Sequence, residues 1–109
     1  MGYIKMTNEK LIRVMIVDDH QVVRQGFTMF LKAFDDFVLV GEAGNGQEAV
    51  DRCSEFSPDV ILMDMVMPIM TGAEAIAVIR ESYPQVQVIA LTSFSDDRQL
   101  VQKALKAGA

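Results

Sequence analysis

The chain has 109 residues, of which 50% are hydrophobic and 23% charged, a composition typical of one globular domain. Fifteen acidic residues against ten basic ones give a net charge of −5, which argues against direct binding of a nucleic-acid backbone. A single cysteine excludes an internal disulfide. No apolar stretch approaches the roughly 18 residues of a membrane span, and no signal-peptide pattern is visible. We therefore expect an acidic, cytoplasmic domain that does not contact a membrane.

From residue 11 onward, short apolar runs alternate with longer segments whose apolar residues recur at helical spacing. The short runs are typical of strands, and each longer segment predicts a helix with one buried face. In chain order the sequence predicts a strand at 14–17, a helix at 22–34, a strand at 38–40, a turn at 44–46, a helix around 49–53, a strand at 60–63, a helix at 73–79, a strand at 88–91 and a helix at 96–107. Residues 1–10 are expected to be a lead-in or a cloning remnant.

The alternation of strands and helices predicts an α/β fold, in which parallel strands form a sheet with helices on both faces. The strands are nearly continuous apolar runs, as expected for strands that are buried on both sides. Each connection from strand to helix to strand should be right-handed. The sequence therefore predicts one domain over residues 11–109.

Polar side chains follow three of the four predicted strands. Asp18 and Asp19 come after the first strand, Asp64 after the third, and Thr92 after the fourth. In an open parallel sheet, ligands bind in the crevice outside the carboxyl ends of the strands. If the first and third strands are neighbours, their ends lie about 4.8 Å apart, so three carboxylates share one pocket. A single aspartate after a strand is more often a helix cap or a turn residue, and the coincidence at one edge is what favours a site.

Three carboxylates in one pocket repel one another unless a cation compensates their charge. Oxygen ligands favour Mg²⁺, which commonly combines one or two protein carboxylates with water and substrate phosphate. An aspartate can also act as a nucleophile and form an aspartyl phosphate. The sequence therefore predicts a Mg²⁺ site that handles a phosphoryl group, with the Thr92 hydroxyl placed to donate a hydrogen bond to it.

Four separated motifs resemble the receiver domain of response regulators. They are DDHQVVRQG at 18–26, GEAGNG at 41–46, VILMDMVMP at 60–68 with Gly72, and LTS at 91–93. The motifs are similar to those of the NarL/FixJ (LuxR-type) class of two-domain regulators. The resemblance extends over about residues 12–109, and the order and spacing of the motifs make it specific.

The resemblance implies a flavodoxin-like (CheY-like), doubly wound parallel sheet of strand order 2-1-3-4, with the family's fifth strand and fifth helix absent from this chain. It implies that Asp64 accepts a phosphoryl group from a sensor histidine kinase, and that Thr92 bonds this group and acts as the switch. It further implies that Mg²⁺ is held by Asp18, Asp19, Asp64 and the backbone carbonyl of Val66.

The resemblance also implies a signalling protein that is not a turnover enzyme. Such a regulator associates with itself on phosphorylation and reaches DNA only through an output domain absent from this chain. The lysine that receivers carry after the fifth strand is absent too, so an alternative is a receiver-like docking module that is not phosphorylated. Without these elements, the fourth strand is expected to be a sheet edge, and apolar surface on the first helix is expected to be uncovered.

Single positions disfavour two other classes of protein. A hydrolase that forms an aspartyl phosphate needs an acid two residues after the nucleophile, where this chain has Val66. A flavin or nucleotide carrier needs Gly, Ser and Thr around its phosphate, where this chain has Asp18 and Asp19. His20 is interpreted as a solvent-facing loop residue and Cys53 as a buried apolar thiol. Asp19 is also a candidate cap of the first helix.

Overall fold

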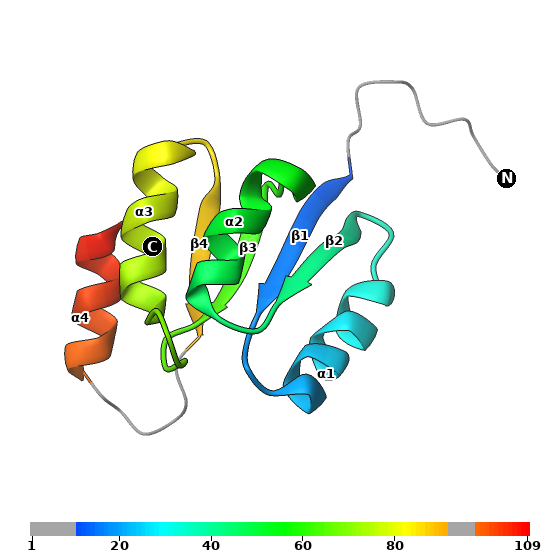
Figure 1. Ribbon diagram of the computed structural model, residues 1–109. Helices are drawn as coiled ribbons and strands as arrows, with labels where there is room; N and C mark the ends of the chain where they lie inside the picture. The colour runs from blue at the N-terminus through cyan, green and yellow to red at the C-terminus, as the bar shows by residue number, and fades with distance from the viewer. Residues whose placement is uncertain (1–10, 92–97) are drawn as a thin grey trace, which may run out of the picture.

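The computed structural model describes residues 11–91 and 98–109 (Figure 1). Its strands and helices alternate in the order that the sequence predicts. They are β1 (Ile12–Val17), α1 (Gln21–Lys32), β2 (Phe37–Ala43), α2 (Gly46–Phe56), β3 (Val60–Asp64), α3 (Gly72–Ser82), β4 (Gln87–Leu91) and α4 (Arg98–Ala107). Two predictions, the lead-in at residues 1–10 and the role of Thr92, lie outside the described residues.

The four strands form one parallel sheet of order β2-β1-β3-β4, which confirms the predicted fold class. Figure 1 shows the carboxyl ends of the strands at the same edge of this sheet. Val17 at the end of β1 pairs with Ala43 on one side and with Met63 on the other, so three strand ends lie level. β2 is longer than the predicted 38–40, because it continues to pair with β1 as far as Ala43.

Side chains of β1 alternate between two cores, one on each face of the sheet. Met15 and Val17 lie in the larger core, which is closed by side chains of α2 and α3. Val14 and Ile16 point to the opposite face and pack with Leu31 of α1. α2 and α3 therefore cover one face, α4 packs beside α3, and α1 covers part of the other face (Figure 1).

The face that α1 covers is only partly shielded from solvent. Phe30 of α1 is 59% exposed, and Ile89 of β4 is 51% exposed. Within residues 11–91 and 98–109, β4 pairs with β3 alone, so β4 is an edge of the sheet as predicted. The exposure of Phe30, together with Met29 at 73%, confirms the predicted uncovered apolar surface on the first helix.

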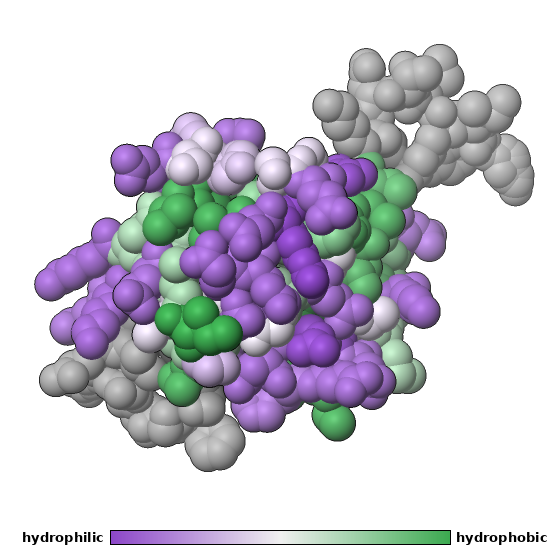
Figure 2. Space-filling view, in the orientation of Figure 1, coloured by the Kyte–Doolittle hydropathy of each residue, from purple (hydrophilic) through white to green (hydrophobic). Residues whose placement is uncertain are grey.

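Hydrophilic side chains cover most of the face that carries α2 and α3 (Figure 2). Hydrophobic side chains gather there around the loop between β3 and α3, where Val66 is 64% and Ile69 is 80% exposed. This loop follows Asp64 directly, so apolar surface borders the predicted site. In the described part of the chain, no helix has both the length and the apolar character that crossing a bilayer requires.

Capping side chains set the starts of the two helices on this face. Oδ1 of Asn45 accepts the backbone N–H of Glu48 at 2.9 Å. Gly46 therefore already belongs to α2, and the predicted turn ends one residue earlier than expected. Thr71 and Glu74 form a reciprocal capping box at the start of α3. Each cap satisfies backbone N–H groups that the first helical turn leaves without partners.

Candidate functional site

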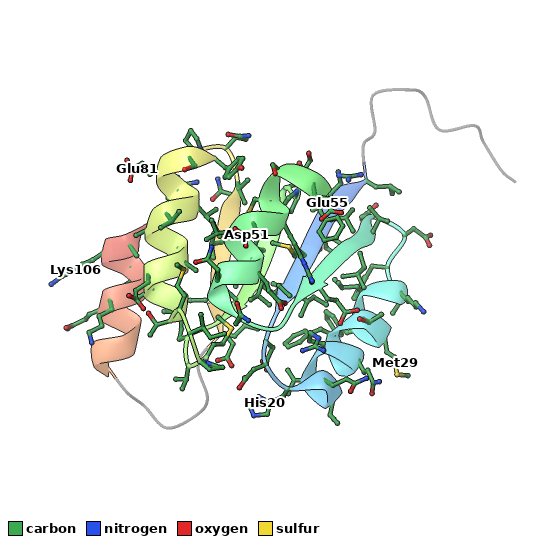
Figure 3. All side chains as sticks on the ribbon, viewed as in Figure 1. His20, Met29, Asp51, Glu55, Glu81 and Lys106 are labelled. Carbon is green, nitrogen blue, oxygen red and sulfur yellow. The ribbon has the colours of Figure 1, made fainter. Side chains whose placement is uncertain are left out.

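The ends of β1 and β3 bring together the three aspartates that the sequence places there, here called the acidic cluster: Asp18, Asp19 and Asp64. Because β1 and β3 pair in parallel to their ends, the side chains that follow them share one edge of the sheet. One carboxylate oxygen of each aspartate and a ring nitrogen of His20 all lie within 4.8 Å of one another. Figure 3 shows His20 at this edge, where β1 leads into α1.

Asp18 is the buried member of the acidic cluster, with 5% of its surface exposed. Its backbone N–H donates to the carbonyl of Ala43 at 3.1 Å, which ties the end of β1 to the end of β2. Its Oδ1 accepts the backbone N–H of His20 at 2.8 Å. The buried carboxylate is thus hydrogen-bonded, as buried polar groups must be, and its position in the cluster is fixed.

His20 is a member of the site that the sequence interpretation missed. Its Nδ1 lies 3.0 Å from Oδ1 of Asp18 and 3.1 Å from Oδ1 of Asp19. The hydrogen bond to Asp18 and the charge of Asp19 raise the pKa of His20. The side chain faces solvent as expected, but its place directly after two aspartates is the signal for this contact. The expectation that Asp19 caps α1 is wrong, because His20 occupies the N-cap position and the Asp19 carboxylate turns toward His20.

Asp64 is half-buried at the last position of β3. Burial raises the pKa of its carboxyl, and the negative charges of Asp18 and Asp19 raise it further. The backbone N–H of Val66 donates to Oδ1 of Asp64 at 3.1 Å and acts in the opposite direction, lowering the pKa. Without a cation, the ionised cluster is therefore electrostatically strained.

Gly72 allows α3 to start directly against the end of β3. A Cβ atom at this position would lie 2.5 Å from the carbonyl oxygen of Asp64 and 2.7 Å from Cα of Met65. The backbone N–H of Gly72 donates to the carbonyl of Met65 at 3.3 Å, which closes the loop over the strand end. A glycine is therefore required here by the close approach of two backbones.

Val66 and Thr92 are the two remaining predicted site residues. Val66 lies beside Asp64 and contacts it through its N–H group, whereas the predicted role of its carbonyl as a metal ligand stays a prediction. Thr92 lies outside the described residues, so its predicted role also stays a prediction.

The acidic cluster opens into a groove with a volume of about 530 Å³ between α1 and β4. Its polar lining residues are Asp18, His20 and Asp64, and its apolar lining residues are Val23, Phe27, Val66 and Leu91. The atoms that the acidic cluster and His20 offer are three carboxylate oxygens and one imidazole nitrogen, with no thiolate among them. The three carboxylates are hard oxygen donors that fit Mg²⁺, whereas the imidazole of His20 is not a ligand that Mg²⁺ favours, and the groove leaves room for a small oxyanion beside the carboxylates.

The sequence matches the family described as "Response regulator receiver domain" over residues 14–109. The chain belongs to this family. It is 44% identical over 97 residues to the response regulator protein VraR of Staphylococcus aureus, which covers 89% of this chain and 46% of VraR. The receiver thus spans about half the length of this relative.

Solved structures agree with the family and with the NarL/LuxR-type class. The signal receiver domain of the response regulator NarL from Mycobacterium tuberculosis superposes with a TM-score of 0.85 at 33% identity, covering 92% of this chain and 80% of that chain. A DNA-binding response regulator of the LuxR family from Staphylococcus aureus gives a TM-score of 0.81 at 30% identity, covering 91% of this chain and 82% of that chain. The chain is therefore a receiver domain of a two-component response regulator.

Proposed function

We propose that this receiver accepts a phosphoryl group on Asp64 from a sensor histidine kinase. The observation that carries the proposal is the convergence of Asp18, Asp19 and Asp64 within 4.8 Å at the carboxyl edge of the sheet. Burial and the neighbouring carboxylates raise the pKa of Asp64, so its charge is unfavourable there, and a cation would offset this charge while leaving the ionised carboxylate as the form that attacks phosphorus.

The residues that would hold Mg²⁺ are Asp18, Asp19 and Asp64, together with the backbone carbonyl of Val66. When bound, the ion supplies positive charge that offsets both the carboxylates and the oxygens of the transferring phosphoryl group. The rest of the site belongs to the chain itself. The His20 N–H holds the Asp18 carboxylate in place at 2.8 Å, and the Val66 N–H holds Oδ1 of Asp64 at 3.1 Å.

Because Oδ1 of Asp64 is engaged by the Val66 N–H, Oδ2 is the atom that attacks. A bond forms between this oxygen and the phosphorus, while the bond from phosphorus to the histidine nitrogen of the kinase breaks. The imidazole nitrogen keeps the electron pair and is then protonated by solvent. The Thr92 hydroxyl is proposed to donate to a phosphoryl oxygen, on the sequence pattern alone.

We propose further that residues 11–109 are the receiver part of a longer cytoplasmic regulator. The chain spans 46% of VraR, and one structural relative is a DNA-binding regulator of the LuxR family. Phosphorylation would shift a pre-existing equilibrium between two surface states, and self-association would then present the output domain to DNA. In this role the receiver carries a signal and does not turn over a substrate.

Intact-mass measurement after incubation with acetyl phosphate tests the proposal. We expect an adduct of one phosphoryl group with Mg²⁺ and none with a chelator. Asp64→Asn should abolish the adduct, whereas Asp51→Asn, which removes a carboxylate from the exposed surface of α2 (Figure 3), should leave it unchanged. No adduct on a folded chain would contradict the proposal and favour the docking module that is not phosphorylated.

A further inference from the structure

Arg24 of α1 reaches back from the helix to the end of β1. Its Nη1 donates to the backbone carbonyl of Asp18 at 2.6 Å. Its Nε donates to Oε1 of Glu42 at 3.0 Å, so a carboxylate on β2 orients the guanidinium. The side chains of Arg24 and Glu42 are 21% and 42% exposed, so this bridge is partly shielded from solvent. One arginine thus connects α1, β1 and β2 at the point where the acidic cluster begins.

Asp18 is consequently fixed through each of its polar groups. Its N–H donates to Ala43 at 3.1 Å, its carbonyl accepts from Arg24 at 2.6 Å, and its carboxylate accepts from His20 at 2.8 Å. The backbone N–H of Arg24 donates to the His20 carbonyl at 3.1 Å, the first bond of the α1 helix, so the guanidinium reaches the Asp18 end of the turn from the helical turn that holds its other end. The direction in which the aspartates of this turn point therefore depends on Arg24.

The charge of Arg24 has the wrong sign to attract a cation. A guanidinium beside a metal site weakens cation binding through space, so any benefit of Arg24 must come from geometry. Arg52 of α2 offers a comparison, because it lines the same polar hollow as Arg24. It donates to the Glu42 carbonyl and lies 3.7 Å from Oε1 of Glu48, so the bonds that the structure gives it do not include Asp18.

We propose that Arg24, oriented by Glu42, is a positioning residue for Mg²⁺ binding, acting by holding the Asp18 carbonyl and with it the turn that carries Asp18 and Asp19. The inference rests on the proposed function, because it concerns the same Mg²⁺ site. Residues that orient metal ligands from behind typically change metal affinity about 10- to 100-fold when replaced. We expect a loss of affinity near the tenfold limit for Arg24, since it holds the backbone of a ligand residue and not the carboxylate itself.

The test measures the Mg²⁺ dissociation constant of the unphosphorylated protein. The protein is titrated with MgCl₂, and NMR signals of the amide groups around the site report binding. Arg24→Gln should weaken binding by about tenfold, although removal of a positive charge alone would tighten it. Arg24→Lys keeps the charge but cannot bridge both partners, so it should also weaken binding. Arg52→Gln is the matched control and should bind as the wild type does, or slightly more tightly.

The outcomes separate this inference from the proposed function. If the wild type does not bind Mg²⁺, the proposed function itself fails. If the wild type binds and Arg24→Gln binds equally well or more tightly, Arg24 has no positioning role. A merely structural role would lower the unfolding midpoint in urea while leaving the affinity of the folded protein unchanged. Should Arg24→Gln not fold, Arg24→Lys and Glu42→Ala decide the question, and unchanged affinity in both would overturn the inference.

Discussion

The Nδ1 atom of His20 lies 3.0 Å from Oδ1 of Asp18, the same oxygen that accepts the His20 backbone N–H at 2.8 Å. This arrangement, with Asp19 on the other side, favours the protonated imidazole. We expect the pKa of His20 in the metal-free protein to lie above its ordinary value of 6.5. NMR titration of the imidazole measures it directly. Asp18→Asn should lower the value, because the hydrogen bond to Asp18 is the largest cause of the shift.

The raised pKa of His20 has a consequence for stability. A group whose pKa is higher in the folded state stabilises the fold fully below the unfolded pKa and loses this contribution as the pH rises through the folded pKa. The metal-free protein should therefore become less stable as the pH rises from below 6.5 through the raised pKa of His20. Urea unfolding in the presence of a chelator tests this, with His20→Gln as the control. An equal loss of stability in His20→Gln would assign the effect to another group.

Asp64→Asn should stabilise the metal-free protein at neutral pH. Burial and the neighbouring charges raise the pKa of Asp64, so its ionised form is disfavoured in the fold, and the cost appears as the pH rises through that pKa. Removing the charge should add less than about 1 kcal/mol to the free energy of unfolding, since solvent screens a half-exposed carboxylate.

With Mg²⁺ added, the wild type should become more stable than Asp64→Asn, the reverse of the order expected for the metal-free proteins. A ligand that binds only the folded state at a hundred times its dissociation constant adds about 2.7 kcal/mol, and Asp64→Asn removes one of the proposed ligands. We therefore expect Mg²⁺ to stabilise the wild type and the surface control Asp51→Asn, and to have little effect on Asp64→Asn. Equal stabilisation of all three proteins would show that Mg²⁺ acts elsewhere.

Cys53 should be unreactive in the folded protein. It is 2% exposed, and burial raises the pKa of its thiol to about 11. Since the thiolate is the reactive form, a rise of about two pKa units above the ordinary value lowers its population roughly a hundredfold. Reaction with an aromatic disulfide reagent should be slow in buffer and fast in urea. A fast reaction in buffer would mean that α2 opens readily from the sheet.

The parallel sheet was predictable because each strand is a short apolar run and helical segments separate the strands, whereas the strand order was implied only by the resemblance to receiver domains. The full length of β2 was not predictable, since Gly41 and Glu42 are poor strand residues. Tertiary packing determines the conformation of this part of β2. A Cβ atom at Gly41 would lie 2.2 Å from the ring of Phe56, so the ring of a distant helix residue requires glycine there. Such a constraint does not show in the local sequence.

The acidic cluster was predictable because parallel strands end at the same edge of a sheet. The groups that support it were not. Arg24 bonds a backbone carbonyl, which leaves no pattern in side-chain type, and the one signal for the His20 contact is its place directly after two aspartates. Both depend on where α1 lies against the sheet. Tertiary packing fixes that position, and local sequence preference does not.

Val66→Asn should speed the loss of the phosphoryl group from Asp64, if the proposed function holds. Val66 is 64% exposed beside Asp64 and offers only an apolar side chain to water that approaches the phosphorus. An amide at this position can orient that water by hydrogen bonding, which lowers the entropic cost of the attack. We expect a several-fold shorter half-life, measured by intact mass after removal of the donor. Val66→Leu is the apolar control and should keep the wild-type half-life.

Gly72→Ala should lower the free energy of unfolding, whereas Gly26→Ala should raise it. A Cβ atom at Gly72 would meet the backbone of Asp64 at 2.5 Å, so α3 must move. Overpacking of this kind costs about 1–3 kcal/mol. Because the movement occurs at the end of β3, Gly72→Ala should also weaken Mg²⁺ binding.

Gly26 is the matched control, since a Cβ atom there would meet nothing within 4 Å. It lies inside α1, where alanine is favoured over glycine by about 0.5–1 kcal/mol. Gly26→Ala should therefore raise the free energy of urea unfolding and leave Mg²⁺ affinity unchanged. If both variants lose stability, α1 is held by contacts that the exposed position of Gly26 does not reveal. If neither changes Mg²⁺ affinity, the start of α3 does not shape the site.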